Sequence, residues 1–315
     1  WSFLWLRMCW ENYWYTGNQD LLCERYYPAV RKMLDRCLEK YIDPGTGLFS
    51  IDAWQFFDWI GLDNQHRCVT HNNTFLVDSL RIGARMAHIA GDDHSAERFS
   101  RMADLLTERI NEYLWDEQRG AYIDSIHDDG TRSSSLSRQI NTLALLHGVV
   151  PPERESSVLE IALGMQTEGV VDFGSPFATL YLLELLGETG RLEAMLDVIR
   201  QKWGGMMDEQ TTTFWESFDT GNLGGSKYPT RSYCHAWSSG AAYVFSRYVF
   251  GARLDKAGGR QVTLTPQLDL LQRAEGVIPL MPGPVELSWQ RNTVSEATLV
   301  VEVKGDIQTT LSLPA

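Results

Sequence analysis

The sequence predicts a mainly α-helical protein in which the helices form hairpins, followed by a small β-domain. Apolar residues recur at helical spacing over the first 250 residues. Breaks rich in glycine, aspartate and proline divide this pattern into segments of helix length. Beyond Gly251 the apolar residues recur at every second position, which is typical of strands with one buried face.

The helical pattern divides into segments that are mostly joined in pairs by very short breaks. Gly17-Asn18 and Gly91-Asp92 are two such breaks, because glycine ends helices and aspartate or asparagine begins them. The predicted helices are 1–16, 19–41, 72–90, 94–114, 136–147, 152–165, 176–187, 190–203 and 232–250.

The connections between pairs are long and alternate with the short ones. A short connection makes its two helices antiparallel neighbours. The alternation therefore places every long connection at the same end of the helices. The long connections are 42–71, 115–135, 166–175 and 204–231, and they contain Asp52, Trp54, Asp58, Trp59, Asp172, Asp208 and Glu216.

A ring of helical hairpins with one decorated face is an (α/α)6 barrel, and we expect it over residues 1–252. A closed barrel of this kind needs twelve helices, whereas the pattern predicts nine. We therefore expect the barrel to lack its N-terminal helices. The alternative is an open array of helices, as in repeat proteins.

Residues 253–315 are predicted to form an antiparallel β-sandwich domain. Apolar residues alternate there between stretches rich in glycine and proline. The alternating residues are Val262 and Leu264, then Val285, Leu287 and Trp289, then Leu299, Val301 and Val303, and finally Leu311 and Leu313. None of these strands carries a residue pattern that indicates chemistry.

The charge of the chain limits its partners. The formal net charge is −13, and nearly all of it lies in the first 250 residues. An acidic surface argues against nucleic acid and anionic membranes as partners. No apolar run reaches the roughly 18 residues that a membrane span needs. A neutral ligand such as a glycoside fits this composition.

Cysteine and histidine spacing gives no indication of a metal or another cofactor. The five cysteines lack a Cys-x-x-Cys pair. They are interpreted as buried apolar residues of a protein in a reducing, cytoplasmic compartment. The seven histidines lack His-x-x-x-His spacing, so no zinc site is predicted.

One carboxylate, Glu216, lies among the aromatic residues Phe214, Trp215 and Phe218. Aromatic rings stack on the C–H faces of a sugar and exclude water from its reacting atoms. A carboxylate in this setting is suited to glycoside hydrolysis. The alternative is a glutamate that lies at the edge of a core cluster and caps a helix.

Two motifs near this carboxylate resemble a known family. Thr211-Thr-Thr-Phe-Trp-Glu216, followed by Cys234-His-Ala-Trp-Ser-Ser-Gly240, resembles the signature of the bacterial α-L-rhamnosidases, glycoside hydrolase family 78. Tyr15-Thr-Gly-Asn18, Phe57-Asp-Trp-Ile-Gly-Leu62 and Gly251-Ala-Arg are also similar to that family. The resemblance covers nearly the whole chain.

The resemblance implies a glycosidase that hydrolyses terminal α-L-rhamnosides, in small molecules or oligosaccharides, with inversion. It implies that Glu216 is the general base, which deprotonates the attacking water. Inversion needs two carboxyl groups roughly 6.5–9.5 Å apart. The family's general acid comes from a motif rich in Asp, Arg and Glu, which residues 1–315 lack. We therefore expect the acid upstream of Trp1.

Four further residues are predicted to bind the substrate. His235 is expected to begin a helix capped by Ser232 and to contact a sugar hydroxyl or Glu216; the alternative is a histidine buried in the core. Trp59 and Trp54 are expected to stack on sugar, although either could instead plug the barrel. Asp58 is expected to bind sugar hydroxyls or to cap a turn. Trp237 is predicted to point away from His235 and to pack.

Other functions remain open at this point. One alternative is another (α/α)6-barrel glycosidase. A second is a glycoside phosphorylase, which would need a cluster of Arg, His and Ser side chains to hold phosphate. Only Arg231 lies near Glu216 in the sequence, and this argues against a phosphorylase. A third alternative is a carbohydrate-binding fragment without catalytic activity.

Overall fold

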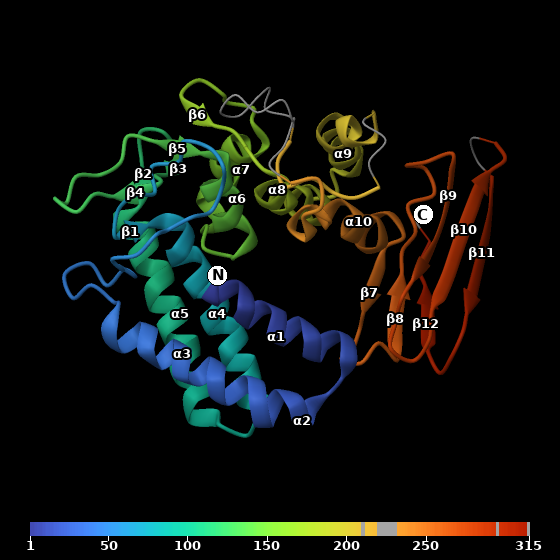
Figure 1. Cartoon of the computed structure of the whole chain (residues 1–315), viewed down its shortest axis with the longest axis horizontal. Coiled ribbons are helices and arrows are strands. Elements are labelled where there is room, and N and C mark those ends of the chain that lie inside the picture. Colours follow the sequence, from blue (N-terminus) through green and yellow to red (C-terminus); the bar gives the residue numbers. More distant parts are fainter. Residues whose placement is uncertain (209–211, 219–231, 294–295, 314–315) are drawn as a thin grey trace.

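The computed structural model of the chain describes residues 1–208, 212–218, 232–293 and 296–313 (Figure 1). Arg231 and the glycine-rich stretch before it lie outside the described residues. The described chain is mainly α-helical up to residue 249, and strands follow from Ala252. This confirms the helical class and the change to strands.

The helices follow the predicted order. They are α1 (Ser2–Thr16), α2 (Gln19–Leu21), a π-helical turn (Leu22–Tyr26), α3 (Tyr27–Lys40), α4 (Thr70–Ile89), α5 (Asp93–Tyr113), α6 (Arg138–Leu146), a 3-10 turn (Pro152–Arg154), α7 (Glu155–Leu163), α8 (Pro176–Glu188), α9 (Leu192–Asp208), a 3-10 turn (Ala236–Ser238), α10 (Gly240–Val244) and a π-helical turn (Phe245–Val249). From α2 to α3 the chain is continuously helical, as predicted for 19–41. Helix α9 runs past its predicted end, so Asp208 lies in a helix and not in a loop.

The predicted start of the last helix at residue 232 is wrong. The first helical turn there begins at Ala236, and His235 precedes it in an extended conformation. The reason is a backbone pairing, because the amide of Glu216 donates to the carbonyl of Ser232 at 2.9 Å. Ser232 does not cap the helix; its hydroxyl accepts from the amide of Cys234 at 3.2 Å.

Helices α4 and α5 form the most extensive hairpin and illustrate why these residues are helical. The buried side chains Phe99, Ala103, Leu106 and Ile110 of α5 recur at three- and four-residue spacing, so they form one apolar stripe. The carboxylate of Asp92 accepts from the amide of Ser95 at 3.0 Å and caps the helix.

The long connections contain short β-pairings that the sequence analysis did not predict. Strand β1 (Cys68–Val69) pairs with β4 (Ser125–Ile126), so the first connection meets the second. The second and third connections meet where β5 (Leu136–Ser137) pairs with β6 (Val170–Val171). A further pair, β2 (Trp115–Asp116) with β3 (Ala121–Tyr122), lies within the second connection. These strands gather at one end of the helices in Figure 1, as the alternation of loop lengths predicts.

Two asparagines hold these connections with the same pattern of hydrogen bonds. Asn73 of α4 accepts from the amide of Phe49 at 2.7 Å and donates to its carbonyl at 3.0 Å. Asn141 of α6 likewise accepts from the amide of Tyr122 at 2.9 Å and donates to its carbonyl at 3.1 Å. Each side chain satisfies a buried backbone amide and carbonyl, so a loop can pass close to the helices without unpaired polar groups.

The strands after residue 251 form two three-stranded sheets. They are β7 (Ala252–Leu254), β8 (Gln261–Leu264), β9 (Arg273–Ile278), β10 (Val285–Arg291), β11 (Ala297–Val303) and β12 (Gln308–Leu311). One sheet has the order β11-β10-β9 and is antiparallel. The other has the order β12-β8-β7, and β12 pairs with β8 in parallel. The prediction of a wholly antiparallel domain is therefore wrong for this pair.

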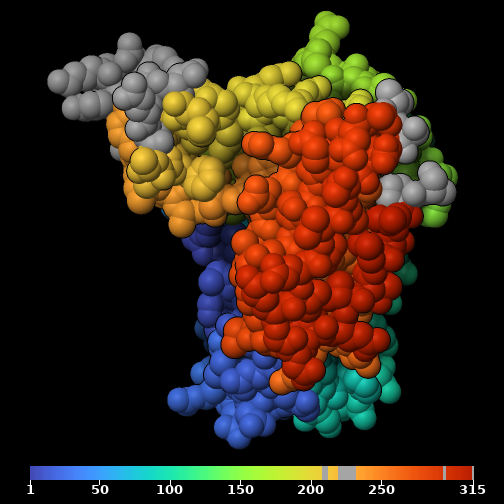
Figure 2. All heavy atoms as spheres, turned by 90° about the vertical axis from the view of Figure 1, so that its right-hand side faces the viewer, coloured from blue at the N-terminus to red at the C-terminus, as the bar shows by residue number. Residues whose placement is uncertain are grey.

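The β-domain shares a core with the helices. Val262, Leu287 and Trp289 are buried in the same cluster as residues of α8 and α9, which confirms the alternation predicted for β8 and β10. In Figure 2 the strands cover one side of the molecule, from α9 at the top to the lower ends of the helical hairpins. No helix in the described ranges is both long and apolar enough to cross a membrane.

The cap of α5 leads to a prediction about pH. Hydrogen bonds from Tyr27 and from Ser95 lower the pKa of Asp92 to about 2. This carboxylate therefore stabilises the fold at pH values above its unfolded pKa near 4, and the effect is lost as the pH falls toward 2. We expect Asp92→Ala to lower the free energy of unfolding by about 1 kcal/mol at pH 7. Urea denaturation of both proteins at pH 7 and pH 2.5 measures it; an equal difference at both pH values would contradict this account.

Candidate functional site

Two chain segments that carry the sequence motifs lie side by side. The amide of His235 donates to the carbonyl of Phe214 at 2.8 Å, beside the bond between Glu216 and Ser232. The indole Nε1 of Trp237 donates to the carbonyl of Glu216 at 2.6 Å. The two motifs therefore fix each other through backbone atoms.

This pairing brings the side chains of Glu216 and His235 together. Glu216 Oε2 lies 3.9 Å from His235 Nδ1. The Glu216 side chain is only 14% exposed, whereas that of His235 is 37% exposed. The carboxylate is thus largely shielded from water, and the imidazole beside it stays accessible. A pair of this kind can orient a bound water molecule and accept a proton from that water.

The aromatic neighbours of Glu216 in the sequence do not surround its carboxylate as expected. Trp215 is 2% exposed and lies edge-on to Tyr233, with ring centroids 5.3 Å apart. Phe218 is also buried and packs edge-on against Trp203 at 5.0 Å. These rings anchor the segment in the core, and the rings available to a ligand come from elsewhere in the chain.

Those rings form a group that we call the aromatic cluster. Its members come from four parts of the chain and are in ring contact with one another: Trp1, Trp54, Phe56, Trp59, Phe177 and Trp237. Trp237 joins the cluster to the carboxylate, because its ring centroid lies 4.5 Å from that of His235. The prediction that Trp237 points away from His235 is wrong. Because His235 is extended and precedes the first helical turn, helical geometry does not apply between the two positions.

Trp54 and Trp59 are the exposed rings of the first long connection. Trp54 is 69% exposed and Trp59 is 39% exposed. Both contact Phe56, at centroid distances of 5.3 and 4.7 Å. Phe56 in turn lies parallel to Trp237, at 6.2 Å and 4°. Trp54 and Trp59, the rings predicted to stack on sugar, are thus linked to His235 and Glu216 by a continuous series of ring contacts.

Asp58 is buried beneath this connection and is 4% exposed. Its carboxylate accepts from the amide of Trp59 at 2.7 Å and from the amide of Gly174 and Nε2 of Gln139 at 2.9 Å each. Burial raises the pKa of Asp58, although these hydrogen bonds act against the rise. Its oxygens bind protein groups of three chain segments, which favours the capping role over direct contact with sugar.

The remaining loop carboxylates have structural partners. Asp52 forms an exposed ion pair with Arg67 at 2.9 Å. Asp172 pairs with Arg138 at 2.5 Å. The side chain of Asp208 lies outside the described part of the structure. Cys234 is exposed, so the interpretation of the cysteines as buried residues is wrong at this position.

The sequence analysis missed two members of the aromatic cluster, Phe56 and Phe177, and the buried histidine His71. Phe177 lies in the first turn of α8 and stacks on Trp237 at 5.4 Å. His71 begins α4, is 1% exposed and stacks on Phe57 at 5.5 Å. Burial lowers the pKa of His71 to about 3, so the imidazole is neutral. For Phe177 and His71 the available sequence signal is their position in the first turn of a helix that follows a long connection, whereas Phe56 lies within the first connection itself.

Comparison with known proteins gives a consistent result. Residues 1–249 match the family model described as the bacterial alpha-L-rhamnosidase 6 hairpin glycosidase domain. An alpha-L-rhamnosidase of Streptomyces avermitilis is 25% identical over 293 residues, which are 90% of this chain and 26% of that protein.

Solved structures are similar over the whole chain. The crystal structure of a GH78 family rhamnosidase of Bacillus sp. GL1 superposes with a TM-score of 0.93 and 37% identity, covering 100% of this chain and 33% of that one. The structure of the S. avermitilis alpha-L-rhamnosidase complexed with L-rhamnose has a TM-score of 0.74 at 22% identity, covering 98% of this chain and 29% of that one. The chain thus spans between a quarter and about a third of the length of these proteins.

The position of Asp58 predicts a structural effect of its removal. Asp58→Ala leaves the amides of Trp59 and Gly174 without their acceptor in a buried place. We expect the free energy of unfolding to fall by about 1–3 kcal/mol. Denaturant unfolding measures this, with Asp52→Ala as the control, because Asp52 is exposed and its ion pair contributes little. If the two variants were equally stable, Asp58 would not anchor the loop that carries Trp59.

Proposed function

Because the chain belongs to the bacterial α-L-rhamnosidases of glycoside hydrolase family 78, we propose that it contains the general base of an inverting α-L-rhamnosidase active site. The substrate is a terminal α-L-rhamnoside of a small molecule or an oligosaccharide. Support for the sugar comes from the related S. avermitilis protein, which has been crystallised with L-rhamnose. The acidic net charge of −13 agrees with a neutral substrate.

The observation that carries the proposal is the pair of Glu216 and His235, 3.9 Å apart, next to the aromatic cluster. A base must hold a water molecule against the anomeric carbon, and it needs a shielded carboxylate with an open edge. The 14% exposure of Glu216 fits this requirement. The backbone of Glu216 is held at both its amide and its carbonyl, so the carboxylate starts from a fixed place.

In the proposed reaction Glu216 takes a proton from water as the water attacks the anomeric carbon. The bond to the leaving oxygen breaks on the opposite face of the sugar, and a second carboxyl group protonates that oxygen. The product sugar has the inverted configuration. His235 donates a hydrogen bond either to the carboxylate or to a sugar hydroxyl. The general acid is expected from the family motif rich in Asp, Arg and Glu.

The aromatic cluster is proposed to hold the sugar and its leaving group. Trp59, which contacts Phe56 beside Trp237, stacks on the sugar nearest the catalytic pair. Trp54 contacts the same Phe56 and is the more exposed of the two rings, so it is proposed to contact the leaving group. Asp58 acts as a positioning residue, since its hydrogen bond to the amide of Trp59 sets the course of the loop.

We also infer that the helical hairpins form part of an (α/α)6 barrel. Support comes from the family description as a six-hairpin domain and from a groove of 610 Å³ between α1 and the helices α8 and α10. Apolar side chains from both sides line this groove, among them Leu4, Trp5, Met8, Phe177 and Leu180. Further helices of the ring would cover such a surface.

Removing the proposed base should abolish most of the activity. In the intact enzyme we expect Glu216→Gln to lower kcat on an aryl α-L-rhamnoside by about 10²–10⁴-fold, because the amide keeps the shape but accepts no proton. Initial rates measure this. Glu97→Gln is the control, since Glu97 is exposed on the surface of α5, and it should keep the full rate.

The stereochemistry and the phosphate dependence of the reaction distinguish the alternatives. Proton NMR during the first turnovers should detect β-L-rhamnose. An α-configured first product would contradict inversion and the role of Glu216 as a base. A rate that depends on inorganic phosphate, with rhamnose 1-phosphate as the product, would identify a phosphorylase instead.

Truncating the side chain of Trp59 or of His235 should weaken the reaction without unfolding the protein. For Trp59→Ala we expect a loss in kcat/KM of about fivefold or more, which corresponds to about 1 kcal/mol of stacking. For His235→Ala we expect a loss that appears mainly in kcat. Leu105→Ala is the control, because Leu105 is exposed to 41%, close to the 39% of Trp59, but lies on α5. Unchanged rates for both variants would remove these residues from the site.

A further inference from the structure

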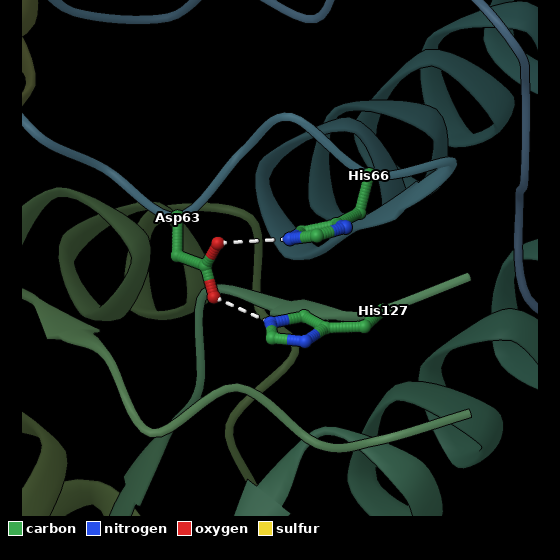
Figure 3. A group of neighbouring side chains, drawn as sticks. All are labelled: Asp63, His66 and His127. Carbon is green, nitrogen blue, oxygen red and sulfur yellow. Dashed lines mark hydrogen bonds and ion pairs between the residues drawn. The ribbon is translucent and has the colours of Figure 1, made fainter. Parts of the chain in front are cut away.

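Three side chains that the proposed reaction does not use converge between the first and second long connections. Asp63 and His66 lie in the first connection, and His127 follows β4 in the second. In Figure 3 the carboxylate of Asp63 faces both imidazoles. Asp63 Oδ1 lies 3.0 Å from His66 Nε2, and Oδ2 lies 2.8 Å from His127 Nε2. The three donor atoms lie within 4.8 Å of one another.

The pairing of β1 with β4 explains this convergence. Cys68 is opposite Ile126, so the chain just before β1, which carries His66, runs beside the chain just after β4, which carries His127. Their rings stack at a centroid distance of 3.9 Å and an angle of 20°, which places both Nε2 atoms on the same side. Asp63 and His127 are 64 positions apart in the sequence, and therefore spacing rules for metal sites do not detect the arrangement.

The surroundings hold the three side chains in place. Ser133 Oγ donates to Asp63 Oδ2 at 2.5 Å. The backbone amide of Asp63 donates to the buried carboxylate of Asp124 at 3.3 Å, and the amide of His127 donates to the carbonyl of Thr131 at 2.8 Å. Burial acts to raise the pKa of Asp63, but the hydrogen bonds from Ser133 and His127 outweigh it and lower the pKa. The carboxylate is therefore an anion at neutral pH.

We propose that Asp63, His66 and His127 bind a divalent transition-metal ion, with Zn²⁺ as the best-matched ion. Two imidazole nitrogens and one carboxylate are a common ligand set for Zn²⁺, with bonds of about 2.0–2.2 Å. The ion would take the place of the two hydrogen-bonding protons between the carboxylate and the rings. Ca²⁺ and Mg²⁺ prefer sets made of oxygen ligands and fit this one poorly.

The site is open to solvent on one side. The side chains of Asp63, His66 and His127 are 28%, 24% and 32% exposed, so water can complete the coordination and the ion can exchange. Ser133 and Asp124, behind Asp63, provide the outer hydrogen bonds that metal sites need to orient their ligands. The negative net charge favours the approach of a cation.

A bound ion would add a further link between the two connections, which are also joined by the β1–β4 pair and by the hydrogen bond from the amide of Thr70 to the carbonyl of Asp124. The first connection also carries Trp54, Phe56 and Trp59. The ion would thus stabilise the loop that bears Trp54 and Trp59, the proposed sugar-stacking rings. Its role is structural, and it does not depend on which sugar the enzyme hydrolyses.

Calorimetric titration of the chelator-treated chain with ZnCl₂ tests the proposal. We expect one bound ion per chain and a rise in Tm as the ion is added, since a ligand of the folded state stabilises it. His66→Ala and His127→Ala should each lower the affinity by about tenfold or more and remove the rise in Tm. His88→Ala is the matched control, because His88 pairs with Asp93 at 3.2 Å but has no second histidine on that carboxylate.

Each variant is compared with its own metal-free form, so a general loss of stability does not imitate the result. If His66→Ala does not fold, the milder His66→Gln replaces it. Zn²⁺ binding with unchanged affinity in the His66 and His127 variants would overturn the proposal, as would binding that disappears in Cys234→Ser. If the unaltered chain does not bind Zn²⁺, the three residues form only a hydrogen-bonded group, and the proposal is overturned. None of these outcomes depends on rhamnosidase activity.

Discussion

Short connections inside the helical hairpins force paired helices to run antiparallel, and this constraint places the long connections together at one end. The pairings of β1 with β4 and of β5 with β6 follow from it. So does the contact of Phe56, in the first connection, with Trp237, which lies at the start of the last helix. Residues that are far apart in sequence can form a site here because the fold returns the chain to this end after every hairpin.

Loops that pass over helix ends must satisfy their backbone groups without regular sheets. The protein does this with buried polar side chains, as at Asn73, Asn141 and Asp58. Each of these residues bonds to backbone atoms of a different loop segment. Since a buried amide without a partner costs about 1–3 kcal/mol, these side chains fix the course of the loops more firmly than their small number indicates.

Much of the helical framework could be predicted from the sequence because helix periodicity and glycine ends are local signals. Gly17 and Gly91, for example, both adopt the left-handed conformation just after a helix. The start at Ala236 could not be predicted in this way, because Ser232 and His235 are held out of the helix by backbone hydrogen bonds to Glu216 and Phe214. The parallel pairing of β12 with β8 is likewise a long-range choice that strand alternation does not encode.

The geometry of the candidate site could be predicted only in part. Glu216 and His235 belong to motifs that are compact in sequence, and they meet because those motifs pair through their backbones. The aromatic partners were assigned less well, because sequence neighbours of Glu216 such as Trp215 turn into the core, while Phe56 and Phe177 arrive from other connections. The Asp63, His66 and His127 group escaped detection for the same reason, as no spacing rule covers residues from two loops.

The first long connection is therefore anchored on both sides of its exposed rings. Asp58 binds it to the loop before α8 and to α6, and Asp63 binds it to the second connection through His127 and Ser133. Trp59 lies between these two anchors. An exposed ring on an unrestrained loop would lose conformational freedom when a sugar stacks on it, and this loss would weaken binding. Anchors on either side reduce that loss, so the polar groups beneath the loop would contribute to the proposed sugar binding without touching the sugar.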